Sequence, residues 1–144
     1  MSTDLPINVG GKTQLDSDGD FQILINANLM NTLSSIEVAA ILVHEISHAF
    51  LGKHYNNSYS SFKDLYSQYI NDKGLKNYSH DIMNDQFINR MATVLQNYDN
   101  QIYSNFEDYK TLASQGVFDL TSSQKNALNN IKNKARNNDT KCKD

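Results

Sequence analysis

One long apolar stretch, IEVAAILVHEISHAFL, constrains the fold of this chain more than any other segment. It follows Ser34-Ser35-Ile36-Glu37, which matches a capping box, in which Ser34 bonds the backbone N–H of Glu37 and Glu37 reaches back. Apolar residues then fall on more than one face, a pattern typical of a helix at the centre of a core. We expect this helix to end at Gly52, because glycine readily takes the left-handed conformation found at helix C-termini.

The remaining chain predicts a small sheet and several further helices. Lys12 to Asn26 holds two short alternating stretches around Asp18-Gly19, which is a strong hairpin signal. The three aspartates of this turn lack the glycine and acidic positions of an EF-hand loop, so a turn is favoured over a calcium site. Apolar spacing and capping signals predict four more helices, over residues 58–70, 79–98, 106–114 and 123–136. The sequence therefore predicts an α+β fold, mostly α, with an N-terminal hairpin packed on the central helix.

Length and charge favour one domain that does not bind nucleic acid. The chain has 144 residues and a net charge of −3, with no linker or internal repeat that would divide it, so residues 1–144 are expected to form a single domain. A basic helical tail is expected from about residue 122, with six basic and two acidic residues from position 125 onward. These charges are diluted by asparagines, a thin footprint for nucleic acid, so we expect a solvated terminal helix that frays.

Targeting signals are weak in this sequence. The longest apolar run, Val38 to Val43, is far shorter than the roughly 18–20 residues of a membrane span, so none is expected. The N-terminus lacks the basic start and apolar centre of a signal peptide, and the single Cys142 excludes a disulfide framework or a Cys-based zinc site. A cytoplasmic location is the expectation, although leaderless export or excision from a longer protein would give the same pattern.

The central helix carries the sequence His44-Glu45-Ile46-Ser47-His48. Residues four apart lie one helical turn from each other on the same face, so His44 and His48 can direct their imidazoles at one metal ion. Glu45 lies about 100° around the helix from His44, where it can hold and deprotonate a bound water without being a ligand. The apolar flanks place this helix against a core, where buried imidazoles and a carboxylate need partners. A zinc ion would provide that partner.

A catalytic zinc usually takes three protein ligands, so a third is needed. We favour His80, which is expected in the first turn of the helix over residues 79–98 and in phase with its apolar stripe. His54 is the alternative, because HEISHAFLGKH matches HExxHxxGxxH in its histidines, although its glycine comes one residue late. An acidic ligand is a further possibility; the candidates are Asp81, Asp85 and Glu107.

The sequence resembles a known group of enzymes at these residues. VAAILVHEISHAFLG, followed by SHDIMNDQFINRMATVLQNYD and then FEDYKTLASQGVF, is similar to minimal zincin metallopeptidases described as SprT-like. The resemblance covers about residues 20 to 120. It implies a zincin-like fold, with His44, His48 and His80 as zinc ligands and Glu45 as general base. The chain departs from the family in having few residues ahead of the helix to build a full zincin sheet, and it has no cysteine set for a zinc ribbon.

The expected function is therefore zinc-dependent hydrolysis of peptide bonds by an endopeptidase that acts on a protein or peptide, with water activated by Glu45. The alternative is a non-catalytic interaction module on a degenerate zincin scaffold. A donor to the oxyanion is also expected, and spacing does not select among Tyr55, Tyr59, Tyr78, Tyr109 and His54. Asp81 or Asp85 would serve to orient His80.

Overall fold

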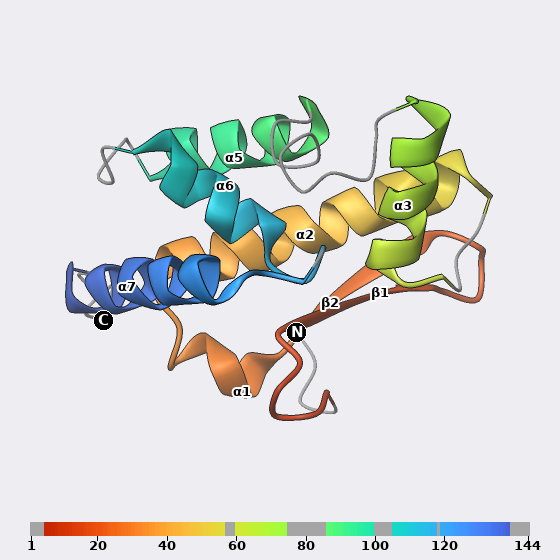
Figure 1. Cartoon of the computed structure of the whole chain (residues 1–144). Coiled ribbons are helices and arrows are strands. Elements are labelled where there is room, and N and C mark those ends of the chain that lie inside the picture. Colours follow the sequence, from red (N-terminus) through yellow and green to blue (C-terminus); the bar gives the residue numbers. More distant parts are fainter. Residues whose placement is uncertain (1–4, 57–59, 75–85, 100–104, 118, 139–144) are drawn as a thin grey trace.

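The computed structural model describes residues 5–56, 60–74, 86–99, 105–117 and 119–138. Its elements, in chain order, are β1 (Gly11–Leu15), β2 (Phe21–Ile25), α1 (Ala27–Met30), α2 (Ser35–His54), α3 (Phe62–Asp72), α5 (Gln86–Tyr98), α6 (Phe106–Ser114) and α7 (Ser122–Asn138). Figure 1 shows α2 crossing the middle of the molecule, with the β1–β2 hairpin on one side and α5 and α6 on the other. The predicted α+β architecture, mostly helical with a small N-terminal sheet, is confirmed.

The hairpin forms where the sequence predicts it. Strands β1 and β2 pair antiparallel, with Gly11 opposite Ile25. Gly19 takes a φ of +83° in the connecting turn, a conformation that costs glycine little. The carboxylate of Asp16 accepts two backbone N–H bonds within the turn, at 3.0 and 2.9 Å. The carboxylate of Asp16 therefore stabilises the turn.

Helix α2 begins as predicted but ends later. The backbone N–H of Ser34 donates to Glu37 Oε2 at 3.0 Å, and the capping box is present. The prediction that Gly52 ends the helix is wrong: Gly52 is buried inside α2, and the helix continues to His54. Asn56 takes the positive φ of +49° just beyond the end instead. Asparagine is one of the few residues with a side chain that tolerate this conformation.

The packing of α2 is that of a central helix. It contacts β1, β2, α3, α5, α6 and α7. Among the described residues, α2 alone is long and apolar enough to cross a membrane when judged by length and composition. That is weak evidence for a span, because the core helix of a folded domain passes the same test.

The other helices lie close to their predicted ranges. Helix α3 begins at Phe62, later than predicted, because Ser61 caps it by accepting a bond from the backbone N–H of Asp64. Helix α5 ends at Tyr98 as expected, and the earlier part of that predicted helix, residues 79–85, lies outside the described residues. Helix α6 spans the predicted residues.

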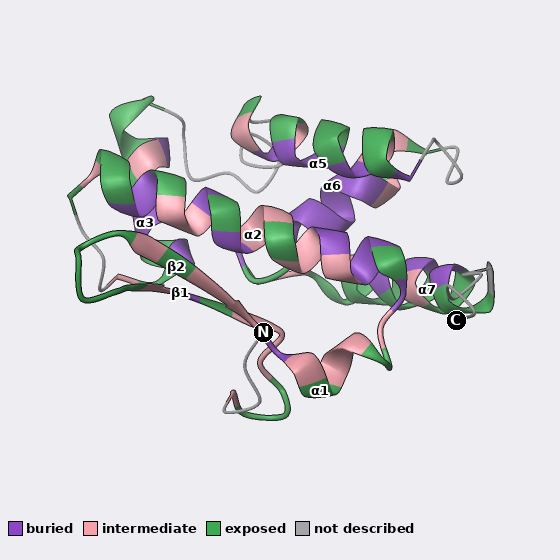
Figure 2. Cartoon of the chain, turned by 180° about the vertical axis from the view of Figure 1, so that it is seen from behind, coloured by how far each residue is buried: buried purple, intermediate pink, exposed green. Residues whose placement is uncertain are grey.

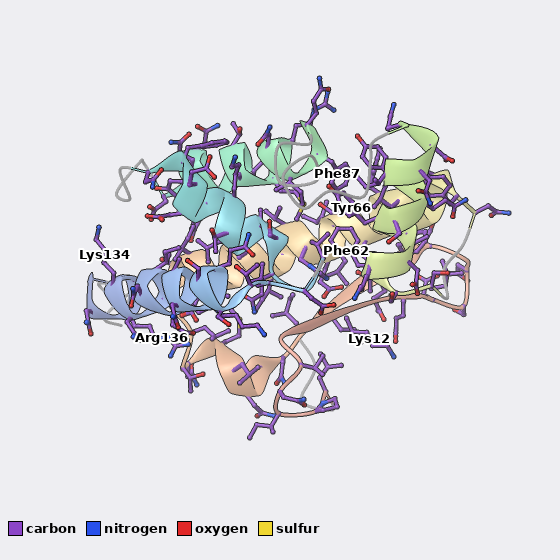
Figure 3. All side chains as sticks on the ribbon, viewed as in Figure 1. Lys12, Phe62, Tyr66, Phe87, Lys134 and Arg136 are labelled. Carbon is purple, nitrogen blue, oxygen red and sulfur yellow. The ribbon has the colours of Figure 1, made fainter. Side chains whose placement is uncertain are left out.

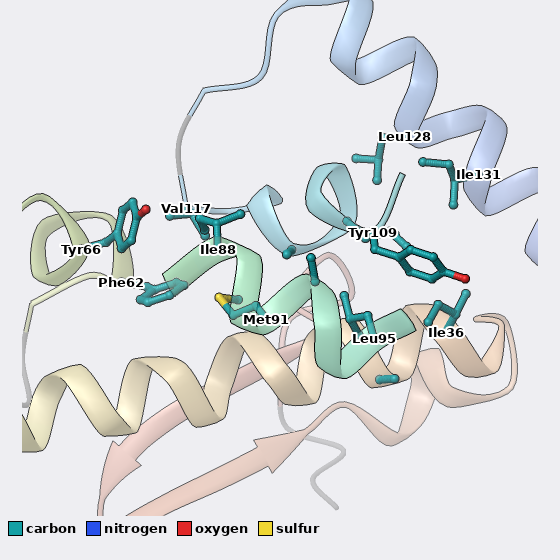
Figure 4. Packing of buried hydrophobic residues seen from close by; sticks show 14 of the residues in the cluster. Ile36, Phe62, Tyr66, Ile88, Met91, Leu95, Tyr109, Val117, Leu128 and Ile131 are labelled. Carbon is teal, nitrogen blue, oxygen red and sulfur yellow. The ribbon is translucent and has the colours of Figure 1, made fainter. Parts of the chain in front are cut away.

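The core lies between α2 and the layer formed by α5 and α6. Figure 4 shows Ile88, Leu95 and Tyr109 packed there, and each is fully buried. In Figure 2 the buried residues of α5 and α6 gather on the faces turned toward the body of the molecule. The hydroxyl of Tyr109 donates to Asp99 at 2.7 Å, so this buried polar tip is paired.

Helix α7 differs from the solvated, fraying tail expected from the sequence. Leu128, Ile131 and Ala135 are buried against the core at 7%, 5% and 3% exposure. Arg136 donates through Nε and Nη2 to the two carboxylate oxygens of Glu37, at 2.9 and 2.6 Å. Helix α7 is therefore packed against the core and bonded to the N-terminal end of α2. The expectation of a solvated, fraying helix is wrong for the described part of this segment, which ends at residue 138.

Candidate active site

The imidazoles of His44 and His48 contact the same aromatic ring. Phe62 is a buried residue at the start of α3. The centroid of its ring lies 4.4 Å from the ring centroid of His44 and 5.9 Å from that of His48. Figure 3 labels Phe62 where α3 meets α2. The Nε2 atom of His48 lies 3.0 Å from the carbonyl oxygen of Ser60, which can only accept, so Nε2 donates there. Helical spacing thus brings the two rings to one side of α2.

His44 occupies an environment that keeps its imidazole neutral. Burial, followed by the nearby His48, lowers the pKa of His44 to about 4, although a hydrogen bond with the main chain of Gln115 opposes this. Gly116, with a φ of +78°, lies so close that a Cβ there would approach His44 Cε1 to 3.1 Å. The Nδ1 atom of His44 is buried and has no hydrogen-bond partner among the described residues. A neutral imidazole with a free lone pair is the form that binds metal ions.

Glu45 lies next to His44 around α2 and points toward the hairpin. Its side chain is buried, with a residue exposure of 6%, and Oε2 lies 2.7 Å from the hydroxyl of Thr13 on β1. The same hydroxyl lies 2.9 Å from the carbonyl oxygen of Glu45. Gly11 allows this approach, because a Cβ there would come within 2.9 Å of Glu45 Cγ. The hairpin therefore fixes the carboxylate of Glu45.

A cavity of about 310 Å³ brings His44 and Glu45 together. One wall is the face of α2 that runs from Glu37 to Glu45 and includes His44. The rest of the lining comes from residues before and at the start of β1, from Leu29 and Leu33, from the end of α6 and from Lys132 of α7. The cavity is large enough for a short stretch of peptide and has a candidate base and a candidate ligand in its wall.

The described residues provide two of the three expected metal ligands. No group of three or more His, Cys, Asp or Glu side chains placed to hold one ion occurs within them. His80, with its neighbours Asp81 and Asp85, lies outside the described residues. The unpartnered Nδ1 of His44 and its neutral ring fit a metal, so the donor set present is compatible with zinc.

The structure does not bring His54 to the other two histidines. Because α2 continues through Gly52, His54 lies about 9 Å further along the helix than His48. It is exposed, and its ring stacks on Phe50 with the centroids 6.4 Å apart. An HExxHxxGxxH arrangement is not formed.

Glu107 also lies away from the two histidines. It pairs with Lys110 at 2.6 Å in the first turn of α6, whereas Gln115, which contacts His44, follows the last turn. A helix of nine residues spans about 13 Å.

Two tyrosines considered as oxyanion donors lie away from the cavity. The hydroxyl of Tyr109 is committed to Asp99 in the core. Burial and a hydrogen bond with Asp72 raise the pKa of Tyr55 to about 12, and Tyr55 lines a separate groove between α2 and α5. Tyr59 and Tyr78 lie outside the described residues.

Several residues of the site are not evident in the sequence. Thr13 and Lys132 come from β1 and α7, so only the tertiary fold brings them to α2. The conformation of Gly116 could have been predicted, because a glycine two residues after the end of a helix commonly takes a positive φ.

Comparison with known proteins identifies the family. The family model for peptidase family M48 matches residues 16–113, about two-thirds of the chain. This range includes the hairpin turn, all of α2 with His44-Glu45-Ile46-Ser47-His48, and most of α6. No curated protein and no solved structure matches the chain. The match agrees with the resemblance to zincin metallopeptidases and is compatible with the SprT-like type. The chain belongs to peptidase family M48, a family of zinc metallopeptidases.

Proposed function

We propose that this protein is a zinc-dependent endopeptidase in which Glu45 is the general base. The observation that carries the proposal is the cavity that has both His44 and the buried, anchored carboxylate of Glu45 in its wall. A carboxylate buried beside an imidazole is a typical arrangement for proton transfer. Membership of family M48 supports a protein or peptide as the substrate.

His44, His48 and His80 are the residues proposed to hold the metal. Two of them share one side of α2, and the third would come from the segment that precedes α5. A bound zinc ion supplies Lewis acidity, which lowers the pKa of water to about 7 and polarises the peptide carbonyl. The neutral state of His44 suits this role, since a protonated ring cannot be a ligand.

Glu45 performs the proton transfers in this mechanism. Thr13 donates to Oε2 and so orients the carboxylate, which leaves Oε1 to take the proton from the attacking water. Glu45 then gives that proton to the amine that leaves when the C–N bond breaks. Burial against the hairpin limits the conformations of the side chain, which keeps the base aligned with its substrate.

Metal removal and replacement test the function directly. Purified protein is expected to contain about one zinc per chain and to hydrolyse casein or a labelled peptide; a strong chelator should abolish hydrolysis, and stoichiometric zinc should restore it. Zinc content is measured by elemental analysis and hydrolysis by fluorescence. Zinc bound at one per chain without hydrolysis of any protein substrate would contradict the proposal and favour the interaction module.

The third ligand can be tested by zinc affinity. His80→Ala should lower the affinity for zinc by at least about tenfold, because one of three protein ligands is lost, while His54→Ala should leave it unchanged. Competition with a chromophoric chelator measures both, and circular dichroism checks that each variant is folded. Unchanged affinity in His80→Ala would show that this residue is not a ligand.

A further inference from the structure

Lys132 of α7 is the lysine that lines the cavity. It is half-buried on α7 and lines the same cavity as His44 and Glu45. Among the described residues it makes no ion pair with a carboxylate within 4 Å. A lysine that is partly buried beside a cavity and has no carboxylate bonded to it is a candidate to bind an anion that enters the cavity.

The carboxylate whose charge acts on Lys132 is that of Glu37, and it already accepts hydrogen bonds from other groups. Glu37 lies at the same end of the cavity, but both of its oxygens accept from Arg136, and Oε2 also accepts from Ser34. Burial lowers the pKa of Lys132; the charge of Glu37 opposes this and the charge of Arg136 adds to it. One carboxylate thus faces two cations, and a net positive charge remains at this end of the cavity.

The position of Lys132 suits contact with a bound peptide. Glu37 and His44 lie on one face of α2, about 10 Å apart along the helix axis. Helix α7 runs antiparallel to α2 (Figure 1). Arg136 contacts Glu37, so Lys132, which comes one turn earlier in α7, lies nearer to His44 than Arg136 does. An extended peptide advances about 3.3 Å per residue. A peptide bond held at His44 therefore has groups one or two residues away within reach of Lys132.

We propose that Lys132 is a specificity-determining residue that binds a carboxylate of the substrate one or two residues from the bond that is cleaved. This inference rests on the proposed peptidase function. The carboxylate can come from the free C-terminus of a peptide or from an Asp or Glu side chain. Arg136 contributes indirectly, because by occupying Glu37 it keeps that carboxylate from neutralising Lys132.

The test uses matched peptides that differ only in charge. A neutral fluorogenic host peptide is compared with versions that carry Glu or Gln one or two residues on either side of the cleaved bond. A second set ends two residues after that bond as a free acid or as an amide. The Glu and Gln pair tests the side-chain source of the carboxylate, and the acid and amide pair tests the chain terminus.

Wild type is expected to prefer one carboxylate series by about tenfold or more in kcat/KM, the usual range for a hydrogen bond to a charged group. Lys132→Met should abolish this preference, and Lys132→Arg should retain it. Lys134→Met is the matched control, because it removes the same charge from an exposed position of α7 that does not line the cavity (Figure 3). Should Lys132→Met fail to fold, Lys132→Gln replaces it.

Binding to the Glu45→Gln variant gives a readout that does not need turnover. Fluorescence anisotropy should show that Glu45→Gln binds the carboxylate peptides more tightly than the neutral ones. This difference in affinity should disappear in the double variant that also carries Lys132→Met. The inference would be overturned if wild type showed equal kcat/KM for the charged and neutral peptides. It would also be overturned if Lys132→Met kept the preference for the carboxylate peptides. Full hydrolysis by Glu45→Gln would instead count against the proposed mechanism alone, since the kcat/KM comparison between wild type and Lys132→Met would still decide the role of Lys132.

Discussion

Replacing Glu45 by Gln should lower kcat for peptide hydrolysis by about a hundredfold to ten-thousandfold, the range associated with loss of a general base. Glutamine has nearly the same shape as glutamate and can still accept the hydrogen bond from Thr13 through its amide oxygen. It cannot take a proton from water at neutral pH. The loss is therefore expected in the chemical step, with little change in KM.

Two controls separate this effect from a loss of structure or metal. Zinc content and thermal unfolding of Glu45→Gln should match wild type, since Glu45 is not a proposed ligand. Glu107→Gln removes an exposed carboxylate, at 61% side-chain exposure, and should leave kcat unchanged. A Glu45→Gln enzyme that contains zinc and keeps the wild-type rate would show that another group accepts the proton.

Local sequence signals predicted those parts of the fold that depend on neighbouring residues. The capping box at Ser34 and Glu37, the glycine turn at Gly19 and the extent of α6 follow from short-range hydrogen bonds and backbone preferences. The end of α2 was missed because Gly52 is buried and packing keeps it helical. Tertiary contacts outweighed the preference of glycine for a helix end.

Helix α7 was misjudged for a similar reason. Leu128, Ile131 and Ala135 form a narrow apolar stripe, but lysines and asparagines surround it and the average composition is that of a solvated helix. The ion pair between Glu37 and Arg136 joins residues 99 positions apart, which no local pattern contains.

In the candidate site, too, some features follow from the local sequence and others depend on tertiary packing. The helical period alone placed His44 and His48 on one side of α2 and Glu45 on another, where the hairpin contacts it. The anchoring of Glu45 by Thr13 and the presence of Lys132 depend on how β1 and α7 pack against α2, and this packing has no signature in either segment. Spacing therefore predicts on which side of α2 these residues lie, but not which groups from other elements contact them.

The second large effect is expected on stability. Arg136→Met should lower the free energy of unfolding by about 2–3 kcal/mol at pH 7, because the buried carboxylate of Glu37 loses both hydrogen bonds from Arg136. The charge of Lys132, which acts on Glu37 without forming an ion pair in the structure, offsets only part of this loss. The Glu37 side chain is 3% exposed, whereas that of Arg136 is 47% exposed, so solvent screening places the loss below the 3–5 kcal/mol typical of a fully buried pair. Urea unfolding followed by circular dichroism measures it, and Lys134→Met is the control for a change of charge on the exposed side of α7.

The pH dependence of this loss identifies its cause. Burial would raise the pKa of Glu37, but hydrogen bonds from Arg136 and Ser34 outweigh it and hold the pKa below its ordinary value of 4.5. A carboxyl with a lowered folded pKa stabilises the protein above its unfolded pKa, and this contribution is lost as the pH falls through the folded value. In Arg136→Met burial has less opposition, so Glu37 takes up a proton at higher pH and the variant recovers part of its deficit. The difference in unfolding free energy between wild type and Arg136→Met should therefore be largest at neutral pH and shrink as the pH falls from the folded-state pKa of Glu37 in the variant toward its lowered wild-type pKa. A difference that stays constant from pH 7 to the lowest pH at which both proteins fold would assign the loss to packing of the Arg136 side chain and not to its charge.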